Sequence, residues 1–217
     1  MSQSLETFSY GDHALQTVTV AKPYPAPLTD NDSDPGYWVI LIHGGAWRDP
    51  TQTSLSYLTP ALNILSSSSA STSQRPKITG YASISYRLSA HPSHPQNPST
   101  EPPATLRTAK HPDHITDIRL ALSFLESKYR IGSRYVLAGH SCGATLAFQA
   151  VMVSLQGSDP RSRPLYKLPM AILGMAGIYD LRLLRDSHVD ISAYQEFIEG
   201  AFGGDEGVWD AASPAVV

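Results

Sequence analysis

The chain has 217 residues, enough for one α/β domain (1–217) with a substantial core and too few to expect two. Its net charge of −3 excludes an electrostatic case for nucleic acid or an anionic membrane surface as a partner. The only cysteine is Cys142, which excludes a disulfide within the chain. The sequence has neither the features of a signal peptide nor an apolar run of membrane-spanning length, and a cytoplasmic protein is therefore predicted.

The first part of the chain reads as strands separated by polar connections. An edge strand is predicted over residues 14–21, where apolar and polar residues alternate. A turn region rich in proline and aspartate follows at 22–35, and the apolar run 37–42 is predicted to be the next strand. Residues 53–65 are predicted to be helical, and residues 66–75 form a serine-rich connection.

The later segments continue the alternation of strands and helices. A strand is predicted at 78–86, followed at 88–112 by a stretch too dense in proline, histidine and serine for regular structure. A loop of that length is usually disordered or a functional cover over a site. An amphipathic helix is predicted at 114–129 and a short buried strand at 170–176. This alternation predicts an α/β fold with a mostly parallel sheet and helices on both faces.

The most informative segment is 134–148, where a buried strand runs through the pattern G-x-S-x-G directly into an apolar helix. This context is typical of a nucleophile elbow, in which a tight turn presents a serine to a base and to helix N–H groups that face the developing oxyanion. Ser141 is therefore the candidate nucleophile. Gly139 and Gly143 occupy positions where a side chain would clash with the neighbouring strand or helix. A merely structural glycine-rich turn is the alternative.

A second motif, H-G-G-x-W, follows the strand at 37–42 and consists of His43, Gly44, Gly45, Ala46 and Trp47. Loops of this form supply backbone N–H donors to the oxyanion hole in esterases of the α/β-hydrolase type, and the paired glycines let the backbone approach the substrate. Because the base follows the serine in this fold, we expect a structural role for His43, whose ring would bond to nearby backbone. Trp47 either packs in the core or meets an aromatic substrate ring.

Six motifs occur together and in order. They are H-G-G-A-W at 43–47, Y-R-L-S at 86–89, H-P-D-H-x-x-D at 111–117, G-H-S-C-G at 139–143, G-I-Y-D-L at 177–181 and W-D-A-A-S-P at 209–214. From about Tyr37 onward the chain resembles the fungal kynurenine formamidases, which are arylformamidases of the α/β-hydrolase fold. The resemblance implies hydrolysis of N-formyl-L-kynurenine to L-kynurenine and formate, on the route of tryptophan breakdown that can lead to NAD, without a metal or organic cofactor. It also places the backbone N–H of Cys142 in the oxyanion hole and allows a homodimer.

The acid and the histidine of the catalytic triad follow the serine in this fold. In the family they lie beyond the Ser-Pro pair at 213–214, where no residue of this chain matches them, so the domain is expected to lack its last strands and helix. Only His188 among the eight histidines follows Ser141, and a solvated loop position is predicted for it. Asp180 is predicted to stabilise the start of a following helix rather than to act as the acid.

Several interpretations stay open. Arg48 is either a surface residue or the partner of a substrate carboxylate. The Cys142 thiol is expected to be a small packing group, and His140 is expected to pack beside the elbow. Two classes of function follow: an arylformamidase, or another carboxylic-ester hydrolase of the same fold, and a non-catalytic truncated product whose open sheet edge would favour association.

Overall fold

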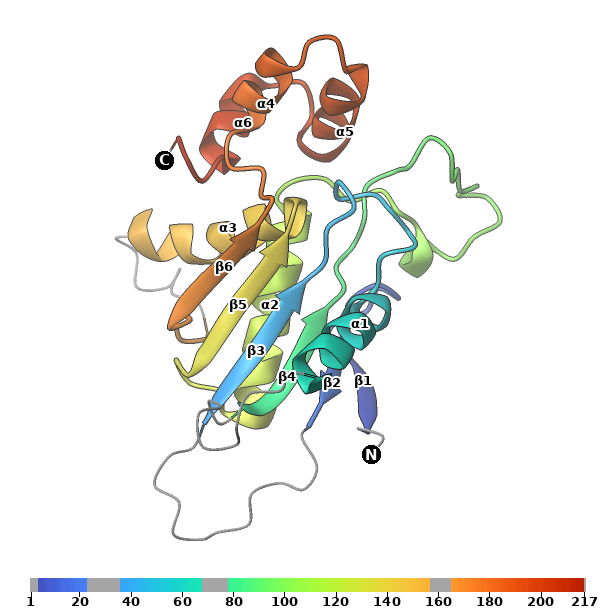
Figure 1. Ribbon diagram of the computed structural model, residues 1–217. Coiled ribbons are helices and arrows are strands. Elements are labelled where there is room, and N and C mark those ends of the chain that lie inside the picture. Colours follow the sequence, from blue (N-terminus) through green and yellow to red (C-terminus); the bar gives the residue numbers. More distant parts are fainter. Residues whose placement is uncertain (1–3, 23–35, 68–77, 157–164, 217) are drawn as a thin grey trace, which may run out of the picture.

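The computed structural model describes residues 4–22, 36–67, 78–156 and 165–216. These residues form a six-stranded sheet with the order β1-β2-β4-β3-β5-β6 (Figure 1). The strands are β1 (Leu5–Ser9), β2 (Thr17–Ala21), β3 (Tyr37–Ile42), β4 (Ile78–Ile84), β5 (Tyr135–His140) and β6 (Ala171–Met175). Strands β4, β3, β5 and β6 pair in parallel, whereas β1 and β2 pair antiparallel to their neighbours. The predicted mostly parallel sheet is confirmed.

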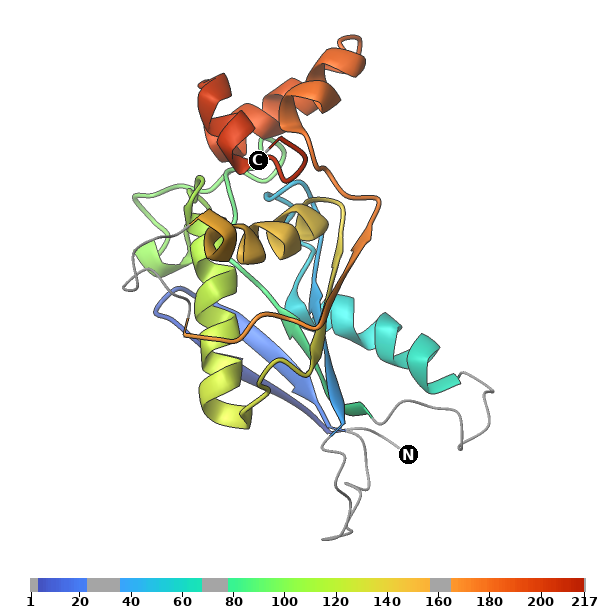
Figure 2. The same ribbon diagram turned by 90° about the vertical axis from the view of Figure 1, so that its left-hand side faces the viewer.

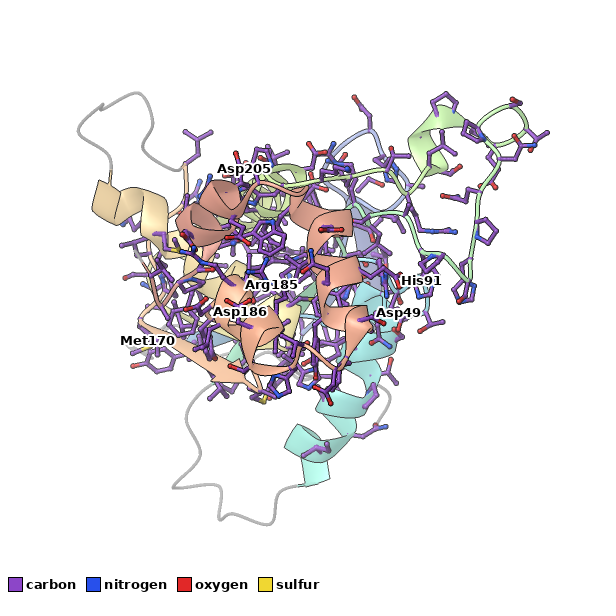
Figure 3. All side chains as sticks on the ribbon, turned by 90° about the horizontal axis from the view of Figure 1, so that it is seen from above. Asp49, His91, Met170, Arg185, Asp186 and Asp205 are labelled. Atoms are coloured by element: carbon purple, nitrogen blue, oxygen red, sulfur yellow. The ribbon has the colours of Figure 1, made fainter. Side chains whose placement is uncertain are left out.

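The helices are α1 (Ser54–Ser67), α2 (Asp113–Tyr129), α3 (Cys142–Gln156), α4 (Leu181–Ser187), α5 (Ser192–Phe202) and α6 (Glu206–Ala212). Helix α1 covers one face of the sheet, and α2 and α3 cover the other, as predicted (Figure 2). Helices α4, α5 and α6 lie above the carboxyl ends of the parallel strands, where the view from above shows them with Arg185 and Asp186 labelled (Figure 3). No described helix is long and apolar enough to cross a membrane.

The N-terminal strands differ from the prediction. The predicted edge strand at 14–21 begins only at Thr17, and it lies inside the sheet because β1 pairs along its outer side. Strand β1 carries mostly exposed side chains, so its sequence has no buried face to reveal it. Its place is set by the ladder to β2 and by a contact between the hydroxyls of Thr7 and Thr19 at 2.9 Å.

Most other elements lie within two residues of their predicted bounds. Strand β3 matches the prediction, α1 begins one residue later and α2 one residue earlier than predicted. Strand β4 ends at Ile84 rather than at residue 86, and the next amide, that of Ser85, donates to the Thr17 carbonyl at 2.9 Å. The predicted connection at 66–75 and the turn region at 22–35 lie almost entirely outside the described residues.

Strand β6 was predicted to be buried, and this is wrong. Leu173 is 53% exposed and Met175 is 39% exposed, because β6 pairs only with β5 among the described residues and so forms an edge of the sheet. Met170, just before the strand, points outward at the rim of the molecule (Figure 3). The alternation of exposed and half-buried residues along β6 is the pattern of a one-sided strand rather than of a central parallel one.

A buried ion pair fixes the end of β4 against α2. The Asp117 carboxylate is fully buried and accepts from the Arg87 guanidinium at 2.8 Å, from the Arg87 backbone N–H at 2.8 Å and from the Gln16 side-chain amide at 2.8 Å. Several hydrogen bonds to one carboxylate compensate for the cost of removing its charge from water. This network fixes the backbone next to Tyr86, whose buried ring stacks on His43.

The long segment at 88–112 is irregular, as predicted, apart from one 3₁₀ turn, η2 (Pro103–Thr105). It is tied to the rest of the fold by backbone and side-chain hydrogen bonds. The Ala14 N–H donates to the Ala104 carbonyl at 2.8 Å, and the Ser89 hydroxyl donates to the Ala109 carbonyl at 2.8 Å. The first bond attaches the segment to the connection between β1 and β2, and the second ties the two ends of the segment together.

Candidate active site

Ser141 lies on the turn between β5 and α3, with a backbone φ of 53°. Few non-glycine residues adopt this left-handed conformation, and functional sites are enriched in such strained positions. The Ser141 N–H donates to the Met175 carbonyl at 2.9 Å, which ties the turn to β6. The side chain is half-buried and lines a cavity. This is the geometry of the elbow that the sequence predicted.

The two glycines of the elbow allow close backbone approaches. A β-carbon on Gly139 would lie 2.2 Å from the Gly143 carbonyl oxygen. A β-carbon on Gly143 would lie 2.3 Å from the Ile42 carbonyl oxygen, at the end of β3. Both positions therefore exclude a side chain for the predicted reason, which is collision with the neighbouring helix start or strand.

The segment Gly44 to Trp47, which we call the oxyanion loop, lies beside the elbow. A β-carbon on Gly44 would be 3.2 Å from the β-carbon of Ser141. The loop turns through three positive φ angles, 98° at Gly45, 50° at Ala46 and 59° at Trp47. Its backbone therefore approaches the candidate nucleophile closely, as donors to an oxyanion must.

His43 has the structural position that was expected. Its Nδ1 lies 2.9 Å from the Gly44 carbonyl oxygen, and its ring stacks on Tyr86 with centroids 4.5 Å apart. The carbonyl can only accept, so Nδ1 carries the proton, while Nε2 has no partner among the described residues. Burial lowers the pKa of His43 to about 4, and the ring is neutral at neutral pH.

Trp47 and Arg48 anchor the loop to α5. The Trp47 ring is fully buried and meets Phe202 edge to face at 5.0 Å. It does not line the cavity, so the core interpretation of Trp47 is confirmed and the substrate-ring interpretation is not. The Arg48 guanidinium donates to the Glu196 carboxylate of α5 at 2.6 Å. Arg48 is thus already paired with a protein carboxylate.

A cavity of about 580 Å³ opens above Ser141. Aromatic side chains line much of it, contributed by Tyr179, Tyr194, Phe197 and His188. Ala46 of the oxyanion loop and Asp180 also line it. No residue of the segment 88–112 lines this cavity, so that segment is not the cover over the site that its length had suggested.

Two residues that the sequence singled out lie on the wall of this cavity. The Asp180 carboxylate accepts from the Leu183 N–H at 2.8 Å and caps α4, as predicted. His188 is exposed, as predicted, yet it also lines the cavity, and its Nδ1 bonds to the Leu184 carbonyl at 3.1 Å. Within the described residues no hydrogen bond joins the Ser141 hydroxyl to an imidazole.

The neighbours of the serine in the elbow have different surroundings. Cys142 is fully buried, and burial raises the pKa of its thiol, in agreement with an unreactive packing group. His140 is exposed, and its ring lies beside the elbow as expected, because a β-carbon on Gly44 would be 3.1 Å from its Nδ1.

Sequence reasoning missed the aromatic lining of the cavity. Tyr179, Tyr194 and Phe197 carry no signal that separates them from ordinary core aromatics, because their contribution depends on how α4 and α5 fold back over the sheet. The described residues also contain no group of three or more metal-ligating side chains.

The sheet order, the strand-to-helix elbow and the covering helices define an α/β-hydrolase fold. Among solved structures, the chain is similar to esterase B from Lactobacillus rhamnosis, with a TM-score of 0.66 and 17% identity over 99% of this chain and 61% of that one. A bacterial heroin esterase gives a TM-score of 0.63 and 16% identity over 99% and 62%. Both have the same fold.

Sequence relatives identify the family. The chain is 44% identical to the kynurenine formamidase-like hydrolase fscH of Fusarium equiseti, over 88% of this chain and 61% of that protein. It is 37% identical to the kynurenine formamidase avaC of Aspergillus versicolor over 96% and 71%, and 30% identical to the kynurenine formamidase of Meyerozyma guilliermondii over 92% and 61%. The chain belongs to the kynurenine formamidase family. It spans about 60 to 70% of the length of these relatives, and it matches no protein-family model.

Proposed function

We propose that this protein hydrolyses N-formyl-L-kynurenine to L-kynurenine and formate, with Ser141 as nucleophile and the N–H groups of Gly44, Gly45 and Cys142 as the oxyanion hole. The observation that carries the proposal is the cavity that Ser141 lines together with Ala46 of the oxyanion loop. Kinship with the kynurenine formamidases supports the choice of substrate.

The reaction has two steps. The Ser141 oxygen attacks the formyl carbon and gives its proton to a base, and the carbonyl oxygen becomes an oxyanion held by the backbone N–H groups. The carbon–nitrogen bond then breaks, the arylamine leaves with a proton, and the formyl group remains as an ester on Ser141. Water hydrolyses this ester to formate. Among the described residues no imidazole is hydrogen-bonded to the Ser141 hydroxyl, so we assign the base to none of them.

The cavity wall supports an aromatic substrate. Tyr194 and Phe197 meet edge to face at 5.7 Å, and His188 adds a third ring 5.2 Å from Tyr194. Such rings favour an aryl group through offset or edge contacts. Asp180 uses one carboxylate oxygen to cap α4, and the other is available to the ammonium group of an amino-acid substrate.

The test compares formate release from N-formyl-L-kynurenine by the 217-residue chain, by its Ser141→Ala variant and by the Aspergillus relative. We expect release that depends on Ser141 but is roughly several thousandfold slower than that of the relative, because no base among the described residues is hydrogen-bonded to Ser141. Equal release by the chain and by Ser141→Ala would contradict the proposal.

Two further outcomes decide between the alternatives. Turnover comparable with that of the relative would mean that a base is present after all, and His188→Ala would then test the one histidine on the cavity wall. A clear preference for a simple aryl ester over the formamide would favour a carboxylic-ester hydrolase.

A further inference from the structure

The thiol of Cys142 is engaged with the oxyanion loop rather than with the cavity. Its Sγ accepts the backbone N–H of Trp47 at 3.3 Å, and the side chain is fully buried. Trp47 is one of the non-glycine residues of the loop with a positive φ. The thiol therefore holds a strained part of the loop in place from behind.

Tyr86 completes this arrangement from the other side. Its hydroxyl donates to the His43 carbonyl at 3.1 Å and lies 3.6 Å from the Cys142 sulfur. Both side chains are fully buried. Because the hydroxyl proton goes to His43, the contact between the two side chains is made by the thiol proton donating to the Tyr86 oxygen.

These contacts form one continuous chain of hydrogen bonds. It runs from the Trp47 N–H to the Cys142 sulfur, from the thiol to the Tyr86 oxygen, and from the Tyr86 hydroxyl to the His43 carbonyl. The chain spans the oxyanion loop from the residue before it to its last residue. Every donor in it has an acceptor, which a buried network requires.

We propose that the side chains of Cys142 and Tyr86 are positioning residues that fix the oxyanion loop for catalysis. Cys142 would then act twice, through its backbone N–H toward the oxyanion and through its thiol toward the loop that carries the other donors. This inference rests on the proposed function, because it assigns a purpose to the loop that the proposed function uses. On this proposal the Cys142 thiol does more than fill space in the core.

The test uses an adduct that needs the oxyanion hole but not turnover. Phenylboronic acid forms a tetrahedral adduct with an active serine, and ¹¹B NMR separates this adduct from the free trigonal acid. Binding constants are measured for the wild-type chain and for Cys142→Ala, Cys142→Ser and Tyr86→Phe. Ser141→Ala gives the ¹¹B spectrum in the absence of the adduct. Leu125→Ala, in the buried face of α2, is a destabilised variant remote from the loop.

We expect Cys142→Ala and Tyr86→Phe each to weaken the adduct about tenfold or more, since one lost oxyanion donor costs about 100-fold or more and a displaced donor costs part of that. Cys142→Ser keeps a donor and an acceptor and should stay within about threefold of wild type. Leu125→Ala should lower the melting temperature and leave the adduct unchanged. Tyr86→Phe keeps the ring that stacks on His43, so it serves if Cys142→Ala fails to fold.

Three results would overturn the inference, and they are distinguishable. Wild-type binding by Cys142→Ala or Tyr86→Phe would leave the thiol as a packing group. Loss of binding in proportion to melting temperature, with Leu125→Ala included, would reduce the effect to stability. The absence of any adduct in the wild-type chain would contradict the proposed nucleophile, and the inference would fail with it.

Discussion

The α-carbon of Gly143 lies so close to the end of β3 that a β-carbon on it would come within 2.3 Å of the Ile42 carbonyl oxygen. Ile42 is the last residue before the H-G-G-x-W motif, and Gly143 is in the first turn of the elbow helix. This close approach allows the candidate nucleophile to lie next to the oxyanion loop, although Ile42 and Gly143 are about a hundred residues apart in the chain.

Replacing Gly143 with alanine should therefore push the elbow away from the loop. We expect Gly143→Ala to lower the free energy of unfolding by about 1 to 3 kcal/mol, the usual cost of overpacking. Gly200→Ala is the matched control, because a β-carbon there meets nothing within 4 Å and alanine favours the helix. Urea denaturation measures both. A Gly143→Ala variant as stable as wild type would show that the approach is not required.

The paired glycines of the oxyanion loop provide a second prediction. Valine at Gly44 would press on Ser141, and valine at Gly45 would be forced into a φ of 98° and against Asp49. Each substitution should slow covalent labelling of Ser141 by an aryl fluorophosphonate at least about 100-fold, since a misplaced oxyanion donor costs that much. If both variants were labelled at the wild-type rate, the loop would be only a structural turn.

Asp180 should stabilise α4 through its cap, and this contribution is separable from its charge. Asp180→Ala removes the acceptor of the Leu183 N–H and should lower the free energy of unfolding by about 1 kcal/mol. Asp180→Asn keeps the acceptor and should retain most of that stability. The proposed contact with a substrate ammonium depends on the charge of the carboxylate. Ligand affinity should therefore fall as much in Asp180→Asn as in Asp180→Ala.

Stability should fall as the pH falls below about 6.5. Burial lowers the pKa of His43 to about 4 and that of His114 to about 3, whereas both have a pKa of about 6.5 in the unfolded chain. The native state therefore binds fewer protons than the unfolded state. The stability from the neutral rings is complete above pH 6.5 and is lost between that pH and the native pKa values, at about 1.4 kcal/mol per pH unit for each ring.

A variant of His114 isolates one of the two contributions. The His114 Nε2 lies 3.1 Å from the Ser89 hydroxyl, which gives its own proton to Ala109, so His114 is the donor. Glutamine can supply the same donor without titrating. Denaturation curves between pH 7.5 and 5 should show a shallower pH dependence for His114→Gln by about one proton. An unchanged slope would mean that His114 titrates alike in the native and unfolded states, and that burial does not lower its pKa.

Local patterns predicted the parts of the site that one segment determines. The elbow around Ser141 and the turn through Gly45 depend on short sequences whose glycines allow close backbone approach or a positive φ. Both could therefore be inferred from the sequence without knowledge of the fold. The structural position of His43 followed from chain order alone. The same reasoning located β3, β5 and α3, because buried apolar runs bounded by glycine have few alternatives.

Features that depend on distant partners could not be predicted. Strand β1 has an exposed, polar sequence and is held by pairing with β2, and β6 is exposed because of its place at the edge of the sheet. The hydrogen bond from Trp47 to the Cys142 thiol joins residues 95 positions apart. No pattern of spacing in the sequence indicates such a contact, so the sequence predicted only a packing role for the thiol.

The measurement that tests the central claim most directly is the mass of the intact chain after treatment with an aryl fluorophosphonate. The account predicts one added phosphonyl group, located on Ser141 by peptide mapping, and no labelling of Ser141→Ala under the same conditions. Labelling of the Ser141→Ala variant, or of a different residue in the wild-type chain, would contradict the assignment of Ser141 as the nucleophile.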